Sequence, residues 1–174
     1  KFVGLQNFEF LWESGKLLSL TKNTILYNLA FILLGNLLAV VVAILLNEMR
    51  CKWFKKVSQT MMFLPYFISQ VLVGFLVFNL LNYDTGFVNE ILTRLGMEKW
   101  GPYSDPHVWP VLLVIIYLWQ QTGYNSVVYF ASICGIDAEM IEASKVDGAN
   151  AFQRIRYILL PSLKPTVIIL LLFA

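Results

Sequence analysis

The sequence has 174 residues, of which 58% are hydrophobic and 14% charged, with a formal net charge of +2. Soluble domains carry about 25% charged residues, so this composition, with a mean hydropathy of +0.67, excludes an ordinary water-soluble domain. A net charge this small identifies no partner by itself. From the apolar composition we expect the chain to contact a lipid bilayer, and we expect no nucleic acid partner.

Three long stretches contain no charged residue, at residues 23–47, 57–83 and 108–136. A helix that crosses a bilayer needs about 20 apolar residues. We therefore predict three complete spans, at about residues 24–46, 57–81 and 109–133, in a single transmembrane domain over residues 1–174. A fourth apolar run begins near Tyr157 and continues to the end of the sequence at 174. Because the opening KFVGLQNF has neither an initiator Met nor a signal-peptide layout, we expect a fragment of a longer membrane protein.

The loops between these spans differ in charge. The loop NEMRCKWFKK carries four basic residues against Glu48, whereas the loop at residues 82–107 carries four acidic residues against Arg94 and Lys99. Lys and Arg accumulate on the cytoplasmic side of membrane proteins. The first loop is therefore predicted to be cytoplasmic, and the second loop and the N-terminal segment to lie outside.

Two local patterns refine the second span and the loop that follows it. Pro65 lacks an amide N–H and should kink the second span, while Gly74 permits a close helix crossing there. Within GFVNEILTRLG, at residues 86–96, apolar residues recur at helical spacing. This segment is predicted to be a short amphipathic helix on the outer surface, ended by Gly96.

The spans contain uncharged polar groups near their centres. Buried amides are costly in lipid, so they should face other helices or a wet cavity. Amide and aromatic walls also suit a neutral, hydroxyl-rich solute. Two interpretations stay open for each residue: a hydrogen bond that only packs two helices together, or a place on a polar pathway. The candidates for the pathway are Asn36, Gln70, Tyr117, Gln120, Gln121, Tyr124 and Asn125.

Groups that would drive transport or catalysis are missing from this pattern. The three complete spans contain no Asp, Glu, Lys or Arg, although ion-coupled pumps usually place ionisable groups there. Cys51, Cys134 and His107 do not stand at metal-ligand spacing. We expect neither a metal site nor a catalytic residue.

Polar residues return in the stretch EASKVDGANAFQRIRYILLP, at residues 142–161. Asp137 is a good N-cap for a first short helix, and Gly148 can end it in a left-handed conformation. Asn150 then caps a second helix, with Gln153 placed for a capping box. Acidic residues outnumber Lys145 in the first helix, which suits a groove on a soluble protein better than an anionic membrane surface. We therefore predict a cytoplasmic docking hairpin over about residues 137–156, from which Pro161 and Pro165 mark a bend into the fourth span.

This hairpin resembles the EAA signature of binding-protein-dependent ABC importer permeases, whose pattern is roughly E-A-A-x-x-D-G-A followed by an aromatic residue, Gln and I-x-L-P-x-L-x-P. The stretches FVGLQNFEFL, MMFLPYFIS and SDPHVWPVLLVIIYLWQQTGYNSVVYFASI are also similar to the carbohydrate-uptake group, which includes the membrane subunits of the maltose transporter. Ser144 departs from the pattern by replacing its second alanine, and Asp137 stands where the family usually has proline.

The resemblance implies an all-α polytopic membrane protein with the ABC importer permease fold, in a bacterial or archaeal cytoplasmic membrane. The first hairpin helix would couple the spans to a cytosolic ATPase, which would bind the ATP and magnesium, so this chain would bind no cofactor and would not be an enzyme. Further implied partners are a second, different permease chain, an extracytoplasmic solute-binding protein and a sugar substrate, either an oligosaccharide or a related sugar. The implied ATPase-coupling residues are Met140, Ile141, Glu142, Ala143, Ser144, Asp147, Gly148 and Ala149.

Two alternatives to a sugar permease stay open at this point. One is an ABC permease for another solute, such as a polyol, glycerol phosphate, a peptide or an amino acid. The other is a membrane scaffold or sensor whose hairpin docks a cytosolic protein without transport. A membrane enzyme is the most distant alternative, because no nucleophile and base are paired in the sequence.

Overall fold

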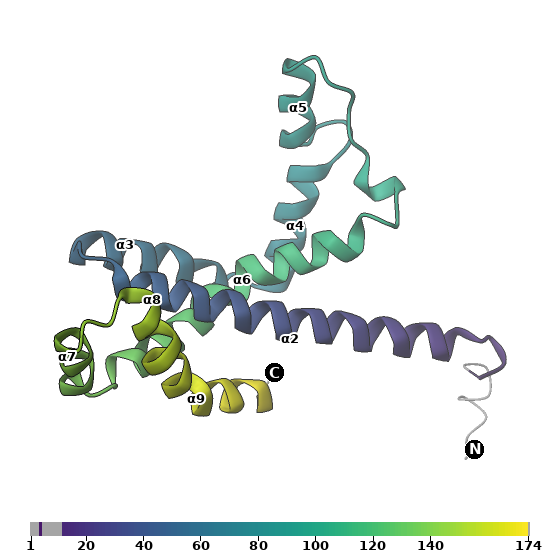
Figure 1. Cartoon of the computed structure of the whole chain (residues 1–174). Helices are drawn as coiled ribbons and strands as arrows, with labels where there is room; N and C mark the ends of the chain where they lie inside the picture. The colour runs from purple at the N-terminus through teal and green to yellow at the C-terminus, as the bar shows by residue number, and fades with distance from the viewer. Residues whose placement is uncertain (1–3, 5–11, 174) are drawn as a thin grey trace.

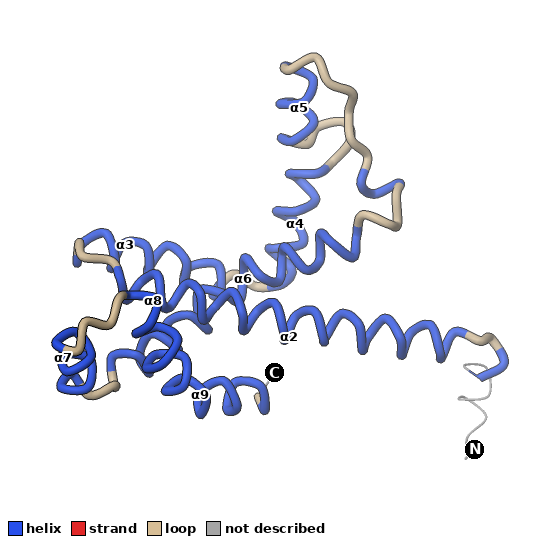
Figure 2. The backbone as a smooth tube through the Cα atoms, viewed as in Figure 1, coloured by secondary structure: helices blue, strands red, loops and turns tan. Residues whose placement is uncertain are grey.

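The computed structural model describes Gly4 and residues 12–173, and within these residues the chain forms helices joined by loops, without strands (Figures 1 and 2). Most of the N-terminal segment that was predicted to lie outside the membrane falls beyond the described residues. The first long helix, α2 (Lys16–Glu48), crosses the central part of α6 (Trp109–Cys134), and this pair makes the most extensive helix–helix contact.

Small residues allow α2 and α6 to approach each other closely. Gly35, Ala39 and Ala43 are buried and recur every fourth residue on α2, so they share one face of the helix. Tyr129 and Ile133 of α6 fill the space beside the two alanines, and Leu159 and Leu163 complete the buried cluster. Since lipid is as apolar as a leucine side chain, close packing of small residues rather than apolar burial stabilises such a crossing.

The range 57–81, predicted as one kinked span, is divided by a sharp break. Helix α3 (Lys52–Phe63) continues into the 3₁₀ turn η1 (Leu64–Phe67), and α4 (Gln70–Leu81) leaves it at an angle of 101°. The predicted effect of Pro65 is present, but the direction changes at Ile68 and Ser69, which adopt extended backbone conformations. Ser69 then caps α4 by accepting a hydrogen bond from the Leu72 amide at 3.4 Å.

Glycine permits a close helix crossing at a different position from the predicted one. A Cβ atom added to Gly74 would meet no atom within 4 Å, so α4 makes no close crossing there within the described residues. At Gly123 of α6, a Cβ atom would lie 1.7 Å from the carbonyl oxygen of Met62. The close approach is therefore between α6 and the C-terminal end of α3.

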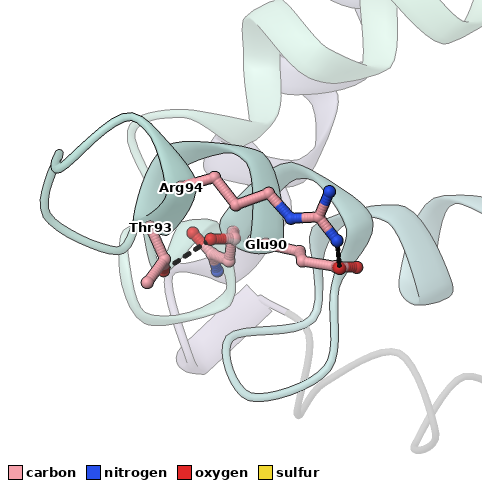
Figure 3. A network of polar contacts seen from close by, with 4 residues as sticks. Glu90, Thr93 and Arg94 are labelled. Carbon is pink, nitrogen blue, oxygen red and sulfur yellow. Dashed lines mark hydrogen bonds and ion pairs between the residues drawn. The ribbon is translucent and has the colours of Figure 1, made fainter.

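The loop that the charge pattern predicts to lie outside contains α5 (Phe87–Arg94) and the 3₁₀ turn η2 (Pro102–Ser104). Helix α5 lies within the predicted range 86–96, and Gly96 follows it with φ of 73°. Arg94 and Glu90 form an ion pair at 2.6 Å (Figure 3). The Thr93 hydroxyl donates a hydrogen bond to the Asn89 carbonyl. The Asn89 side chain is buried and connects α5 to the Trp100 backbone, donating to its carbonyl at 2.8 Å and accepting from its amide at 2.7 Å.

The C-terminal part of the chain forms the hairpin and a final long helix. Helix α7 (Ala138–Val146) is followed by α8 (Ala151–Arg154), the π-helical segment η3 (Ile155–Leu159) and α9 (Leu160–Leu172). The last three form one helical run, which begins earlier than the predicted fourth span near Tyr157. Pro161 has no N–H to donate to the preceding turn, and the π turn stands directly before it, so the helical run passes through the proline without interruption.

Helix composition supports a multi-pass membrane protein. Two helical runs of the described chain, Lys16–Glu48 and Ala151–Leu172, are long and apolar enough to cross a membrane, and the bent pair from α3 to α4 qualifies when taken together. Helix α6, predicted as the third span, has the length but not the hydropathy, because Gln120, Gln121 and Asn125 interrupt its apolar sequence. The amides of α6 consequently have to be satisfied by neighbouring helices or by a cavity.

Candidate functional site

Five of the seven residues predicted to face a polar pathway line one cavity of about 470 Å³. The cavity is bounded by α2, η1, α6 and α9, so residues distant in sequence meet there. The predicted residues on its wall are Asn36, Tyr117, Gln121, Tyr124 and Asn125, and the residues that the sequence did not indicate are Phe31, Tyr66, Leu170 and Phe173.

Two stacked pairs of aromatic rings stand on the wall of the cavity. Phe31 of α2 stacks on Tyr117 of α6 with ring centroids 4.3 Å apart, and Tyr66 of η1 stacks on Tyr124 of α6 at 4.4 Å. The planes of the two pairs are 18° and 12° from parallel. Each pair joins α6 to another element, so the stacking fixes both the width of the cavity and the direction of the rings.

The side-chain amides on the wall differ in whether their hydrogen-bond donors and acceptors are already used within the protein. The Asn36 side chain accepts a hydrogen bond from the Tyr129 hydroxyl at 2.6 Å and donates to the Ile32 carbonyl at 2.7 Å. No hydrogen bond within the described chain engages the half-buried side-chain amides of Gln121 and Asn125. Their donors and acceptors are therefore available to a polar solute in the cavity.

The other two predicted residues, Gln70 and Gln120, lie away from the cavity. The Gln70 amide donates to the Gln120 side-chain carbonyl at 3.0 Å, and the Gln120 amide donates to the Ile68 backbone carbonyl at 2.9 Å. Gln120 is only 4% exposed. Of the two interpretations open for these residues, the geometry favours a hydrogen bond between helices.

The hairpin is shaped by caps and by one glycine. The Asp137 carboxylate accepts from the Glu139 amide at 2.9 Å and so caps α7. Asn150 and Gln153 form the predicted capping box at the start of α8, with bonds of 2.9 and 2.8 Å. Between them Gly148 adopts φ of 77°, a left-handed conformation that residues with a Cβ atom rarely take. The predicted turn between the two helices is thus built as the sequence indicates.

Helix α7 projects from the end of the molecule and packs little against the other helices (Figure 1). Glu142, Ala143 and Asp147 are exposed, whereas Ile141 and Ser144 are partly covered. The exposed apolar side chains Val146, at 88%, and Phe152, at 69%, flank the turn; Phe152 is the aromatic residue of the motif, whereas Val146 stands at a position that the motif leaves open. Apolar side chains this exposed beside a short helix are typical of a surface that a protein partner covers.

Residues 11–174 match the family of binding-protein-dependent transport system inner membrane components. The chain belongs to this family. Membership confirms the predicted resemblance. The family consists of membrane components of transport systems, which agrees with the prediction that this chain is not itself an enzyme.

Several relatives in this transport family are named by what they carry. The chain is 32% identical to the polygalacturonan/rhamnogalacturonan transport system permease protein YteP of Bacillus subtilis, over 99% of this chain and 54% of the relative. It is 31% identical to the lactose transport system permease protein LacF of Rhizobium radiobacter, over 97% of this chain and 56% of the relative. The chain thus spans about half the length of these curated relatives.

Solved structures of the same kind of transporter share the fold. A bacterial ABC transporter involved in the import of the acidic polysaccharide alginate matches with a TM-score of 0.91 and 32% identity, over 99% of this chain and 60% of that one. The alginate transporter in complex with an alginate pentasaccharide-bound periplasmic protein matches with a TM-score of 0.90. The all-α ABC importer permease fold predicted from the sequence is confirmed by these matches.

Proposed function

We propose that this chain forms part of the permease subunit of an ATP-driven importer for a saccharide, and that the cavity between α2, η1, α6 and α9 is part of its route. The observation that carries the proposal is the composition of the cavity wall. Two stacked aromatic pairs offer flat faces to the apolar side of a sugar ring, and the amides of Gln121 and Asn125 can bond hydroxyl groups.

The charge of the saccharide divides this proposal into two candidates. The described wall of the cavity carries no ionisable group other than tyrosine hydroxyls, which favours a neutral sugar. The solved neighbours are described as importing an acidic polysaccharide, which favours an acidic one. Amide N–H groups can donate to carboxylates as well as to hydroxyls, so the same wall serves either candidate.

The hairpin would connect this route to ATP hydrolysis. Helix α7 would insert into a cleft of a cytosolic ATPase subunit, with Glu142, Val146 and the turn at Gly148 at the contact, and the ATPase would hold the ATP and magnesium. The exposure of α7 and its few contacts with the rest of the chain support this role. The hairpin would then lie in the cytoplasm, and the outer loop with α5 would face the solute-binding protein outside.

A second permease chain would complete the route. Helices α2, α4 and α9 expose large apolar side chains, which suit either lipid or another permease. The resemblance to carbohydrate-uptake permeases implies that this second permease is a different chain, so we expect a heterodimer.

Reconstituted uptake tests the coupling part of this function. The full-length permease, its ATPase, its second permease and its binding protein would be assembled in liposomes and supplied with lactose or with an alginate oligosaccharide. We expect ATP-dependent uptake of one of them, and its loss in both Gly148→Pro and Glu142→Lys. Glu98→Lys makes the same charge reversal at an exposed site on the outer loop and should leave the ATPase bound.

Each result has a defined consequence. Uptake at the wild-type rate in both hairpin variants, with the ATPase still bound, would contradict the coupling role. ATPase binding without uptake of any solute that the binding protein carries would instead favour a scaffold or sensor.

A further inference from the structure

The side chain of Gln120 connects α6 to the break between η1 and α4. Its amide nitrogen donates to the Ile68 carbonyl at 2.9 Å, and its carbonyl oxygen accepts from the Gln70 amide at 3.0 Å. Both partners belong to the break, and Gln120 is 52 residues from Ile68 and 50 residues from Gln70 in sequence. Gln120 is only 4% exposed, whereas Ile68 is half-buried and Gln70 is exposed, so the two bonds are partly buried.

The break needs such a partner because its backbone leaves the helical hydrogen-bonding pattern. Ile68 is extended, with ψ of 126°, and its amide donates to the Pro65 carbonyl at 3.1 Å. Its carbonyl points away from any helical partner and receives the Gln120 amide instead. A buried backbone carbonyl without a partner is costly, and the cost is greatest in a membrane.

The same break joins two functional parts of the chain. On one side, Tyr66 of η1 stacks on Tyr124 in the cavity wall, and Gln121 follows Gln120 directly. On the other side, α4 leads to α5, and together with the loop to residue 108 they form an outer arm that projects from the bundle of α2, α3 and α6 (Figure 1). Helix α4 packs mainly against α5, so the break is where the arm is held at its inner end.

We propose that Gln120 is a positioning residue that sets the direction of the outer arm, residues 70–108, relative to the cavity wall. It acts through Ile68 and Gln70 and does not contact the solute, because both atoms of its amide are already engaged. The part of the inference that concerns binding-protein docking on the arm rests on the proposed function. The part that concerns the angle of the break does not.

Distances between spin labels measure the angle directly. Nitroxide labels at Thr60→Cys on α3 and Asn79→Cys on α4, both exposed positions, would be introduced into the full-length permease with Cys51 and Cys134 replaced by serine. The parent should give one narrow distance distribution by double electron–electron resonance. Gln120→Leu should raise the population outside the main peak by about tenfold, because it removes both bonds and leaves the half-buried Ile68 carbonyl without its partner.

Two further variants keep the test decisive. Gln70→Leu removes only one of the bonds at an exposed residue, so it should fold and should broaden the distribution less than Gln120→Leu. Ser132→Ala removes a different bond between helices, the 2.8 Å contact with Thr166, and should leave the distribution unchanged. A distribution that is unchanged in both glutamine variants would overturn the proposal.

The kinetics of the assembled transporter distinguish a change in the direction of the arm from a general loss of stability, because the half-maximal binding-protein concentration and the maximal rate are measured separately. If the arm presents α5 to the binding protein, Gln120→Leu should raise the binding-protein concentration for half-maximal ATP turnover by about tenfold, with the maximal rate kept, because a less ordered surface binds more weakly. Ser132→Ala should match the parent in both values. A lower maximal rate at an unchanged half-maximal concentration would contradict docking through the arm. Absence of any stimulation in the parent would count against the proposed function and leave the angle measurement standing.

Discussion

Gly123 lies where α6 crosses the C-terminal end of α3, and the position tolerates no side chain. A Cβ atom there would be 1.7 Å from the Met62 carbonyl oxygen and 2.8 Å from the Phe63 amide nitrogen. Both obstacles are backbone atoms within a helix, which cannot rotate away as a flexible side chain can. The two helices would have to separate, and that movement would also displace η1 and the cavity wall.

We therefore expect Gly123→Ala to lower the melting temperature of the detergent-purified permease, with a cost of about 1–3 kcal/mol for overpacking. Gly74→Ala is the matched control, because it adds the same methyl group on α4 where nothing lies within 4 Å. Differential scanning fluorimetry would measure both. Equal melting temperatures for the two variants would show that α3 and α6 are not as close as described.

Single residues also show how far the sequence could predict the site. The polar residues of α6 were identifiable, but Gln120 and Gln121 differ in function although they are neighbours. Successive residues of a helix are about 100° apart around its axis, so one faces the break and the other the cavity. Which of them faces which depends on where η1 lies, and that placement comes from tertiary contacts that no local pattern contains. Phe31 and Tyr66 were missed for the same reason.

At the scale of elements, the hairpin is the part that local chemistry predicts best. Its caps and its glycine turn are short-range features, and the structure forms each of them from the residues that the sequence indicated. The break in the second span is the opposite case. Pro65 indicated a kink, but at the observed bend of 101° a distant side chain, Gln120, bonds the carbonyl that the break leaves without a helical partner.

The left-handed turn of the hairpin leads to a graded prediction. Residues with a Cβ atom pay about 1–2 kcal/mol to adopt the conformation of Gly148, whereas Asn is tolerated there better than most. We expect ATP turnover coupled to uptake to fall in the order Gly148, Gly148→Asn, Gly148→Ala and Gly148→Val. A Cβ at this position meets nothing within 4 Å, so backbone conformation and not crowding would be the cause.

Amide hydrogen exchange of residues 138–154 would measure the strain in the turn directly. Exchange should become faster along the same series of Gly148 variants, since a strained turn should open more often. If Gly148→Ala and Gly148→Val exchanged and turned over as the parent does, the turn would not be the element that transmits the motion.

For the whole molecule, the orientation in the membrane follows from charge and is testable with the native cysteines. Cys51 lies between α2 and α3 and Cys134 ends α6, and both are exposed. In the proposed orientation, the basic loop beside Cys51 should lie at the cytoplasmic side, and the alternation of the spans should bring Cys134 to the same side. A membrane-impermeant maleimide should therefore label them in inside-out vesicles and not in right-side-out vesicles.

A cysteine introduced at Thr85, in the outer loop, should show the reverse pattern in a background where both native cysteines are replaced by serine. Labelling of Cys51 from the outside of intact cells would invert the proposed orientation, and the hairpin could then not meet a cytosolic ATPase.

The length of α2 has a consequence for the membrane around the protein. Its 33 residues correspond to about 50 Å at about 1.5 Å per residue, while the hydrocarbon layer is about 30 Å thick. The helix must therefore tilt strongly or extend its first turns, which carry Lys16 and Lys22, into the headgroup region. Because α2 is fixed to α6 by Gly35, Ala39 and Ala43, any change in tilt would turn the cavity wall with it. A change in bilayer thickness should therefore change the tilt of α2 and, through it, the geometry of the cavity wall.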